Sequence, residues 1–259
     1  MDNQNLIELC VKVTGAFEGG VAAYDTLAGN FDGQGLSAGV LQWNAGSGTL
    51  QNLLIRIAAK MGWDKLQSYF ISDIHKFALL SPPDAVQWCA THYLAENSTN
   101  VAPEAAERWK TLLQTQESID AQVEYASDTV LSWAINAAAK YCPDTPTSTR
   151  AIVFFFDLMT QSGGMSNAKG KVLPLGAGVV PNVADALAFA QQQDLKCAGM
   201  WEIALQNDPL AERLLYYAYH RSLLSSPAYV WDAFSRRGAI ACRCGIVHKT
   251  PVNFTQLLD

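Results

Sequence analysis

The amino-acid sequence predicts a mostly α fold (α+β), largely helical with one small β element near its start. Apolar residues recur with the period of a helix over most of the chain after residue 46. Residues 21–46 differ, because they hold five glycines and alternate between apolar and polar side chains. That pattern is typical of short strands and turns, so we expect a β-hairpin element near residues 30–44.

The first predicted helix begins near Leu6, where apolar side chains start to recur every three or four residues. Gly19 and Gly20 are expected to end it, because glycine commonly follows the last turn of a helix. Glu18 is therefore predicted to be the final helical residue.

The other predicted helices follow the hairpin in order. Prolines open several of them, Pro143 closes the longest, and glycines at 163–164 end a strongly apolar one before a loop over 163–181. These helices are expected at 49–60, 81–95, 103–115, 117–141, 148–161, 182–193, 208–224 and 227–242. The simplest organisation is a single domain over residues 1–259, with two lobes and a cleft between the 1–46 region and the helical remainder.

Composition and charge narrow the class of function. The 259 residues are 49% hydrophobic and 16% charged, with a net charge of −6 and a pI near 5.2. No run of Lys and Arg exceeds two residues, which argues against nucleic acid as a partner. The longest apolar run, at 151–156, ends at Asp157 and is too short for a membrane span. We therefore expect neither nucleic acid nor a membrane as a partner.

The start of the chain bears on where the protein acts. Residues 1–5 are polar and lack the basic segment and apolar run of a signal peptide. We expect synthesis in the cytoplasm without a signal peptide, so that any extracytoplasmic role requires non-classical export.

The cysteines predict neither a disulfide framework nor a metal site. Their six positions have no framework-like spacing, and a chain of this length folds without cross-links. Cys242, Cys244 and His248 offer only three candidate ligands, and Cys-x-Cys is a poor zinc spacing. We expect mostly buried free thiols, no metal and no cofactor.

Two carboxylates near the start of the chain lie beside glycines and aromatic residues. Hydrolysis of a glycosidic bond needs an acid for the leaving oxygen and a second carboxylate across the scissile bond. Glu18 follows an apolar helix, where partial desolvation favours a protonated acid. Asp32 lies in a polar turn that suits an ionised base holding a water, and the hydroxyl of Ser37 could orient that water. The alternatives are a solvated helix-end Glu18, a turn-forming Asp32 and a competing carboxylate at Asp25.

Aromatic and amide side chains near these carboxylates are candidate sugar-binding groups. The apolar face of a sugar packs on a ring, so Tyr24, Phe31 and Trp43 could form platforms, with core packing as the alternative. Gln42 and Asn44 could hydrogen-bond sugar hydroxyls or amides.

Two stretches of the sequence resemble a known family. DGQGLSAG at residues 32–39 resembles DGRGITAG, a stretch of the chitosanases of glycoside hydrolase family 46. In those chitosanases, a Phe-Glu pair at the end of a helix precedes this stretch. FFDLM at residues 155–159, followed by glycines at 163–164, resembles the buried helix of that family that carries an aspartate and a methionine. The family belongs to the lysozyme-like superfamily, so the resemblance implies a two-lobed, lysozyme-like helical domain.

The resemblance also implies roles for single residues. It makes Glu18 the general acid, Asp32 the general base and Ser37 the water-orienting hydroxyl of an inverting glycosidase. Serine keeps the hydroxyl of the family's threonine, whereas Gln34 replaces an arginine beside the base and bears on substrate preference. The interval between Glu18 and Asp32 is shorter than in the chitosanases.

Asp157 has a physical argument of its own. It lies inside an apolar run, and a buried carboxylate is costly unless it is paired. In the resembled family a buried Asp–Arg network supports the catalytic glutamate, so we expect Arg237 or Arg236 to be the partner of Asp157. The alternative is that Asp157 lies on a solvated stripe of its helix.

These observations favour a peptidoglycan hydrolase that cleaves β-1,4 glycosidic bonds, a muramidase- or lysozyme-like activity. The exchange of arginine for Gln34, the shorter interval and the lack of a secretion signal favour cell wall over chitosan. Such a hydrolase resembles either an antibacterial toxin, a type VI secretion effector delivered to the periplasm of a target cell, or a phage lysin that uses a holin. A toxin of this kind implies a cognate immunity protein. The alternatives are a chitosanase, which the acidic pI suits, and a catalytically silent saccharide-binding domain.

Overall fold

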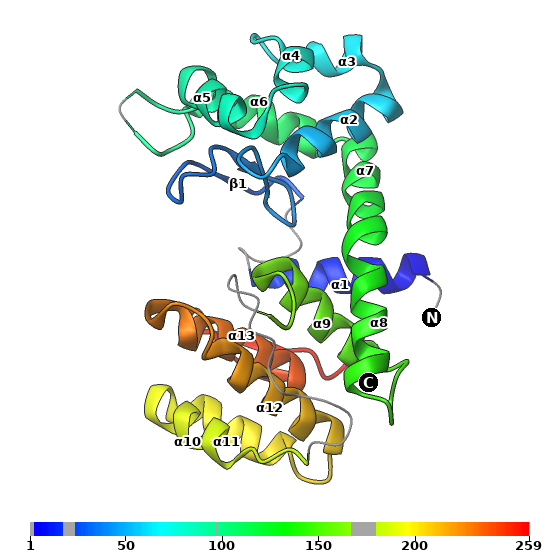
Figure 1. Cartoon of the computed structure of the whole chain (residues 1–259), viewed down its shortest axis with the longest axis vertical. Helices are drawn as coiled ribbons and strands as arrows, with labels where there is room; N and C mark the ends of the chain where they lie inside the picture. The colour runs from blue at the N-terminus through cyan, green and yellow to red at the C-terminus, as the bar shows by residue number, and fades with distance from the viewer. Residues whose placement is uncertain (1–2, 18–23, 97, 167–179, 259) are drawn as a thin grey trace. The chain divides into compact units, whose positions relative to one another are not determined.

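The computed structural model describes residues 3–17, 24–96, 98–166 and 180–258. The chain forms two compact units (Figure 1). Unit 1 comprises Met1–Phe17 and Thr129–Asp259, and unit 2 comprises Glu18–Asp128. The mostly helical fold with a small β element between residues 27 and 44 confirms the predicted class.

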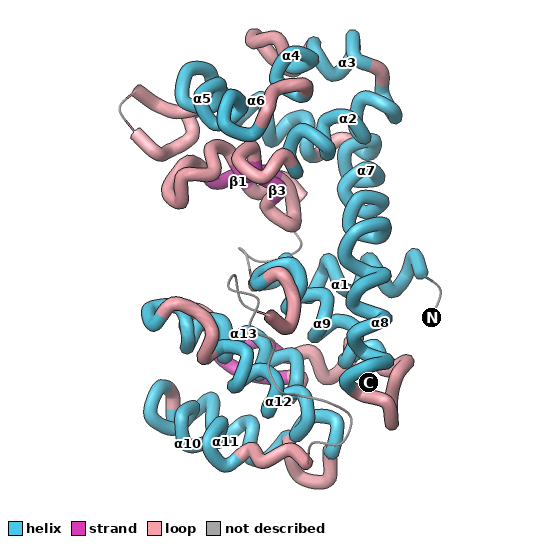
Figure 2. The backbone as a smooth tube through the Cα atoms, viewed as in Figure 1, coloured by secondary structure: helices cyan, strands magenta, loops and turns pink. Residues whose placement is uncertain are grey.

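Unit 2 begins with a small antiparallel sheet of order β1-β2-β3. The strands have two residues each, β1 (Leu27–Ala28), β2 (Ser37–Ala38) and β3 (Trp43–Asn44), and Figure 2 shows them set among loops. Ser37 pairs with Ala28 on one side and with Asn44 on the other. β2 is thus the central strand, and its two residues are buried.

The rest of unit 2 is helical. Its helices are α2 (Thr49–Met61), α3 (Trp63–Gln67), α4 (Ile74–Ala78), α5 (Pro82–His92), α6 (Pro103–Leu113) and α7 (Gln116–Ala126). Asp73, Ser81 and Thr115 cap α4, α5 and α7 by accepting backbone N–H groups. The apolar face of α2 packs against α7 (Figure 1).

Helical backbone continues beyond the end of α7 without an intervening loop. A π-helical turn, Ser127–Leu131, follows it and leads into α8 (Ser132–Tyr141). The helix predicted over 117–141 is therefore present, but it is interrupted, and the boundary between the two units falls inside the π-helical turn.

Unit 1 surrounds α9 (Thr149–Ser162), a helix that carries a long apolar run. Residues 150–158 of α9 are all buried, and α1 (Asn3–Ala16), α8 and α13 (Val230–Ala241) pack around it. The other elements are α10 (Ala184–Gln193), α11 (Leu195–Ala204), α12 (Pro209–Ser222), β4 (Cys244–Val247) and β5 (Thr250–Asn253). Figure 1 shows α12 beside α13 and α10 beside α11.

One predicted boundary needs correction, and one element was not predicted. α1 ends at Ala16, and the N–H of Phe17 bonds to Thr14 O at 3.2 Å, so a tight turn closes the helix before Glu18. The predicted end at Glu18 lies two residues too far. The sequence pattern also missed the β4–β5 hairpin, whose strands are short and follow α13 directly.

The structure also shows the state of the cysteines and the length of the apolar helices. All six cysteines are free, and only Cys244 is not fully buried. Among the residues that the structure describes, no helix is long and apolar enough to span a bilayer.

Candidate active site

Asp32 lies in a glycine-rich turn that its own side chain helps to fold. Its Oδ1 accepts the backbone N–H of Gln34 at 3.0 Å, and Asn30 Oδ1 accepts that of Gly35 at 2.8 Å. Gly33 and Gly35 both have φ near +80°, a conformation that favours glycine. Asp32 is exposed, so its carboxylate is anchored on one side and open to water on the other.

Ser37 follows this turn on the central strand of the sheet. It is 6% exposed, and pairing on both sides fixes its backbone. The sheet thus holds a hydroxyl at a defined place directly after the turn that carries Asp32.

The amide side chains near the sheet hold turns together. Gln42, at φ 54°, donates from Nε2 to Gly39 O at 2.9 Å and to Thr26 O at 3.3 Å. Asn44 Oδ1 accepts the N–H of Ser47 at 2.9 Å. These bonds stabilise the hairpin, and a role of Gln42 and Asn44 in binding sugar stays a prediction.

Gln34 and Tyr24 flank the same region. The carbonyl of Gln34 accepts the N–H of Gly46 at 2.8 Å, so the backbone at the replaced arginine is tied to the end of the hairpin. Tyr24 is partly buried in the turn before β1. Their contribution to substrate binding stays a prediction.

The aromatic candidates differ in exposure. Phe31 is 75% exposed beside Asp32, as a sugar platform requires. Trp43 is 7% exposed and stacks on Tyr125 of α7, with ring centroids 5.5 Å apart and planes 12° apart. Trp43 therefore belongs to the core of unit 2.

The competing carboxylate has a partner of its own. Asp25 Oδ2 accepts a hydrogen bond from Gln114 Nε2 at 2.7 Å. Asp25 precedes the sheet, whereas Asp32 lies in the glycine-rich turn that leads directly into β2.

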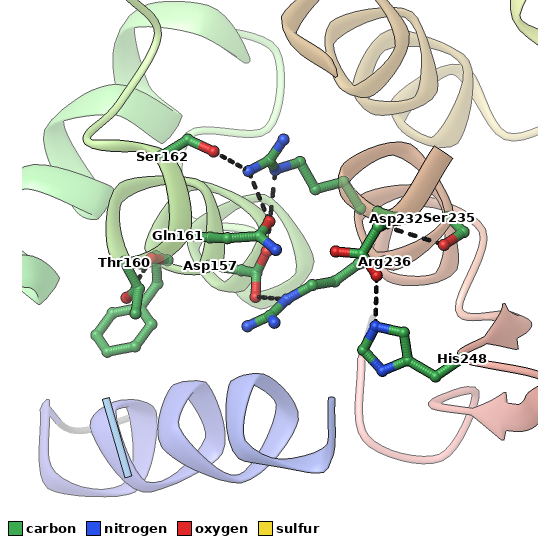
Figure 3. A network of polar contacts seen from close by, with 10 residues as sticks. Asp157, Thr160, Gln161, Ser162, Asp232, Ser235, Arg236 and His248 are labelled. Atoms are coloured by element: carbon green, nitrogen blue, oxygen red, sulfur yellow. Dashed lines mark hydrogen bonds and ion pairs between the residues drawn. The ribbon is translucent and has the colours of Figure 1, made fainter. Parts of the chain in front are cut away.

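Unit 1 contains a buried charge cluster on α9 and α13 (Figure 3). Asp157 is completely buried, and Arg236 Nε donates to its Oδ1 at 2.7 Å. Arg237 Nε lies 3.9 Å from Oδ2 of the same carboxylate. Both predicted arginines are therefore at Asp157, and a solvated stripe is excluded.

Arg237 has further partners that the sequence pattern did not identify. Its guanidinium donates to Gln161 Oε1 at 2.9 Å and to the hydroxyl of Ser162. Burial lowers the pKa of Arg237 to about 10, while the charge of Asp157 acts in the opposite direction. Gln161 comes four residues, about one helical turn, after Asp157, and that spacing was the available signal.

The cluster extends to the end of α1. The guanidinium carbon of Arg236 lies 4.9 Å from the centre of the Phe17 ring, and Phe17 also meets Phe254 edge-on at 5.7 Å. Glu18, the predicted acid, lies outside the described residues. The residue directly before it is thus held by the Asp157–Arg236 pair.

A metal site does not emerge from the part of the chain that the structure describes. There, no three His, Cys, Asp or Glu side chains are grouped to hold an ion, Cys242, Cys244 and His248 included. His248 instead pairs with Asp232 of α13 (Figure 3).

Comparison with known proteins identifies the fold. No protein-family model and no curated protein sequence matches the chain. A solved chitosanase complex matches with a TM-score of 0.53 and 15% identity over 94% of each chain. The Gynuella sunshinyii GH46 chitosanase in complex with chitotetraose matches with a TM-score of 0.53 and 15% identity, over 93% of this chain and 87% of its own.

A third structure, chitosanase OU01 with substrate, gives a TM-score of 0.52 and 14% identity over 94% of each chain. The predicted resemblance to the GH46 chitosanases is confirmed at the level of the mostly helical fold, which this chain shares with them over nearly its whole length.

Proposed function

We propose that this chain is a glycoside hydrolase that cleaves β-1,4 bonds of an amino-sugar polymer with inversion, and that peptidoglycan is its substrate. One observation carries the proposal. In a chain with the fold of chitosanases, Asp32 is exposed on an anchored turn directly before the strand that holds Ser37.

The proposed reaction is a single displacement. Asp32 takes a proton from a water, the water oxygen attacks the anomeric carbon, and Glu18 donates its proton to the leaving glycosidic oxygen. The hydroxyl of Ser37 orients the water. An exposed, hydrated carboxylate suits the base, because the base must be ionised and in contact with water.

In unit 1, the buried cluster supports the acid. Asp157 and Arg236 fix Phe17, and the chain continues from there into Glu18. Loss of this anchor would displace the start of the segment that carries the acid.

The preference for peptidoglycan rests on Gln34 and on the short interval between Glu18 and Asp32. Gln34 lacks the positive charge that the chitosanase pattern places beside the base. Wall glycan lies outside the cytoplasm, so we place the activity in the periplasm of a target cell, with an immunity protein protecting the producer. The toxin role is part of the same proposal.

Chitosan is the second candidate, and the distribution of charge favours it. Residues 18–128 hold 13 Asp and Glu against 6 Lys and Arg, whereas the rest of the chain holds 11 against 12. The negative charge of the protein therefore belongs to the unit that carries Asp32. Such a surface attracts a polycation, and the solved relatives include one bound to chitotetraose.

Parallel digestion of purified sacculi and of chitosan tests the proposal. We expect the wild type to release muropeptides with reducing sugar ends, identified by mass spectrometry, and Asp32→Asn and Glu18→Gln to release at least about 100-fold less. Cleavage of chitosan alone would establish the second candidate. Sugar binding without product from either polymer would leave the saccharide-binding domain.

A further inference from the structure

Helix α7 carries a side chain that reaches the sheet beside the candidate site. Gln122 is completely buried, and its Oε1 accepts the backbone N–H of Val40 at 3.0 Å, across 82 residues of sequence. Val40 lies in the turn that joins β2 to β3, two residues after the end of β2. A rigid helix thus holds the turn that leaves the central strand.

The approach of this side chain depends on a glycine. Gly39 has φ +82°, and a Cβ at this position would lie 2.5 Å from Gln122 Oε1 and 3.0 Å from the ring of Trp43. Any other residue would push the glutamine and the tryptophan away. Gly39 also donates its N–H to Thr26 O at 2.9 Å, so the turn is fixed from both sides.

Of the two polar atoms of the Gln122 side-chain amide, the oxygen forms the hydrogen bond to Val40. Its Nε2 is buried and makes no hydrogen bond with any residue that the structure describes. A buried donor without a partner costs stability, and an apolar side chain of the same length would avoid that cost. The feature that distinguishes glutamine at this position is therefore its acceptor oxygen on Val40.

A second side chain of α7 acts on the same hairpin. Tyr125, one turn after Gln122, stacks on Trp43 of β3. Gln122 thus holds the turn, and Tyr125 holds the strand that leaves it. Since β2 has two residues, its place is set by these neighbours more than by its own ladder.

We propose that Gln122 is a positioning residue, which holds the β2–β3 turn so that the Ser37 hydroxyl meets the attacking water. This inference rests on the proposed function. A displacement of about 1 Å in a catalytic group can cost as much as 100-fold in rate. The expected loss is in kcat, because orientation of the water matters in the transition state and contributes nothing to sugar binding.

Gln122→Met tests the inference, because methionine has a similar length and no acceptor oxygen. We expect kcat on the glycan that the wild type cleaves to fall about 10- to 100-fold, with KM within about twofold. Amide hydrogen exchange at Val40 should accelerate about tenfold or more. If the methionine variant fails to fold, Gln122→Asn, which keeps the amide but is too short to reach Val40, should show the same loss of kcat.

Gln67→Met is the matched control. Gln67 is a glutamine of unit 2 that also holds backbone, with bonds to Phe70 O, Ser72 O and Ile74 N at 3.0–3.2 Å. It fixes a loop remote in sequence from the sheet, so its loss should lower the melting temperature and leave kcat unchanged.

The outcomes distinguish failure of the positioning role of Gln122 from failure of the proposed function. Faster exchange at Val40 with an unchanged kcat would overturn the positioning role while leaving the proposed function intact. An equal loss of kcat in Gln67→Met would also overturn it, because stability alone would then explain the effect. A wild type that cleaves neither sacculi nor chitosan would overturn the proposed function itself.

Discussion

Two aspartates, one in each unit, occupy opposite environments. Asp32 is exposed on a glycine-rich turn, with one oxygen on a backbone N–H and the rest of the carboxylate in water. Asp157 is completely buried in α9, with Arg236 on one oxygen and Arg237 near the other. The charge of Asp32 is stabilised mainly by water, whereas that of Asp157 is stabilised by arginine side chains of the protein.

This difference in environment indicates different roles, because Asp32 is accessible for chemistry and Asp157 supports the fold. A base must reach a water and a substrate, so it needs an open side and few fixed partners. A buried carboxylate that two guanidinium groups enclose is inaccessible to substrate, but it fixes two helices relative to each other. Charge-removing substitutions should therefore affect different quantities in the two units.

The largest expected effect is on stability, from Asp157→Ala. Removal of the carboxylate takes away the buried charge that Arg236 and Arg237 share, which should lower the free energy of unfolding by about 3–5 kcal/mol. Urea denaturation at pH 7 measures the loss. Asp144→Ala is the control, because its side chain is 80% exposed and pairs with Arg213 only at the surface. Equal losses of unfolding free energy in Asp157→Ala and Asp144→Ala would show that the buried pair contributes no more to stability than the surface pair.

Asp32→Asn should show the converse pattern. Asparagine keeps the oxygen that accepts the Gln34 N–H, so stability should change by no more than about 0.5 kcal/mol. Glycan hydrolysis should fall about 100- to 10,000-fold, because the variant cannot take a proton from water. Asp25→Asn is the matched comparison. A large loss there with none in Asp32→Asn would make Asp25 the base.

The sequence predicted both aspartates, but for different reasons. Asp157 stood out because a charge inside an apolar run must find a partner, and Asp32 because of the glycines around it. The register of the arginines was open, since it depends on how α9 meets α13. No local sequence pattern predicted the contact between Gln122 and the sheet, because a glutamine in a helix resembles any surface residue until the sheet is placed against it.

The errors of prediction have a similar origin. The glycines at 19 and 20 suggested a helix that runs to Glu18, whereas the bond from Phe17 N to Thr14 O closes α1 earlier. Packing of Phe17 under Arg236 and against Phe254 favours that earlier end. Tertiary contacts thus decided a boundary that the local pattern left within two residues.

A third aspartate lies between the two extremes. Asp208 caps α12 and forms two hydrogen bonds to Arg150, at 2.7 and 2.9 Å. Partial burial acts to raise the pKa of Asp208, but the bonds and charge of Arg150 outweigh it and hold the pKa below its ordinary value of 3.8. A lowered pKa in the folded state stabilises the protein above the unfolded value, and this stability is lost as the pH falls.

Asp208→Asn should therefore cost about 1–3 kcal/mol of unfolding free energy at pH 7. Asparagine still accepts the N–H of Ala211, so the variant removes the charge and keeps the cap. The difference from wild type should shrink as the pH falls through 3.8 and below. Urea titrations from pH 7 to pH 2.5 measure it. A difference that stays constant over that range would show that the ion pair is not its source.

The smallest expected effect concerns substrate contact beside Asp32. Phe31 and Ile71 are both apolar, both in unit 2 and both 75% exposed, but only Phe31 adjoins the candidate base. If a sugar covers roughly 40 Å² of the Phe31 ring, the contact contributes about 1 kcal/mol. Phe31→Ala should then raise KM about threefold to tenfold with kcat nearly unchanged, while Ile71→Ala changes neither. Equal KM values in the two variants would remove Phe31 from the substrate path. A fall in kcat with Phe31→Ala would mean that the ring positions the Asp32 turn, so that the open side of this aspartate also depends on packing.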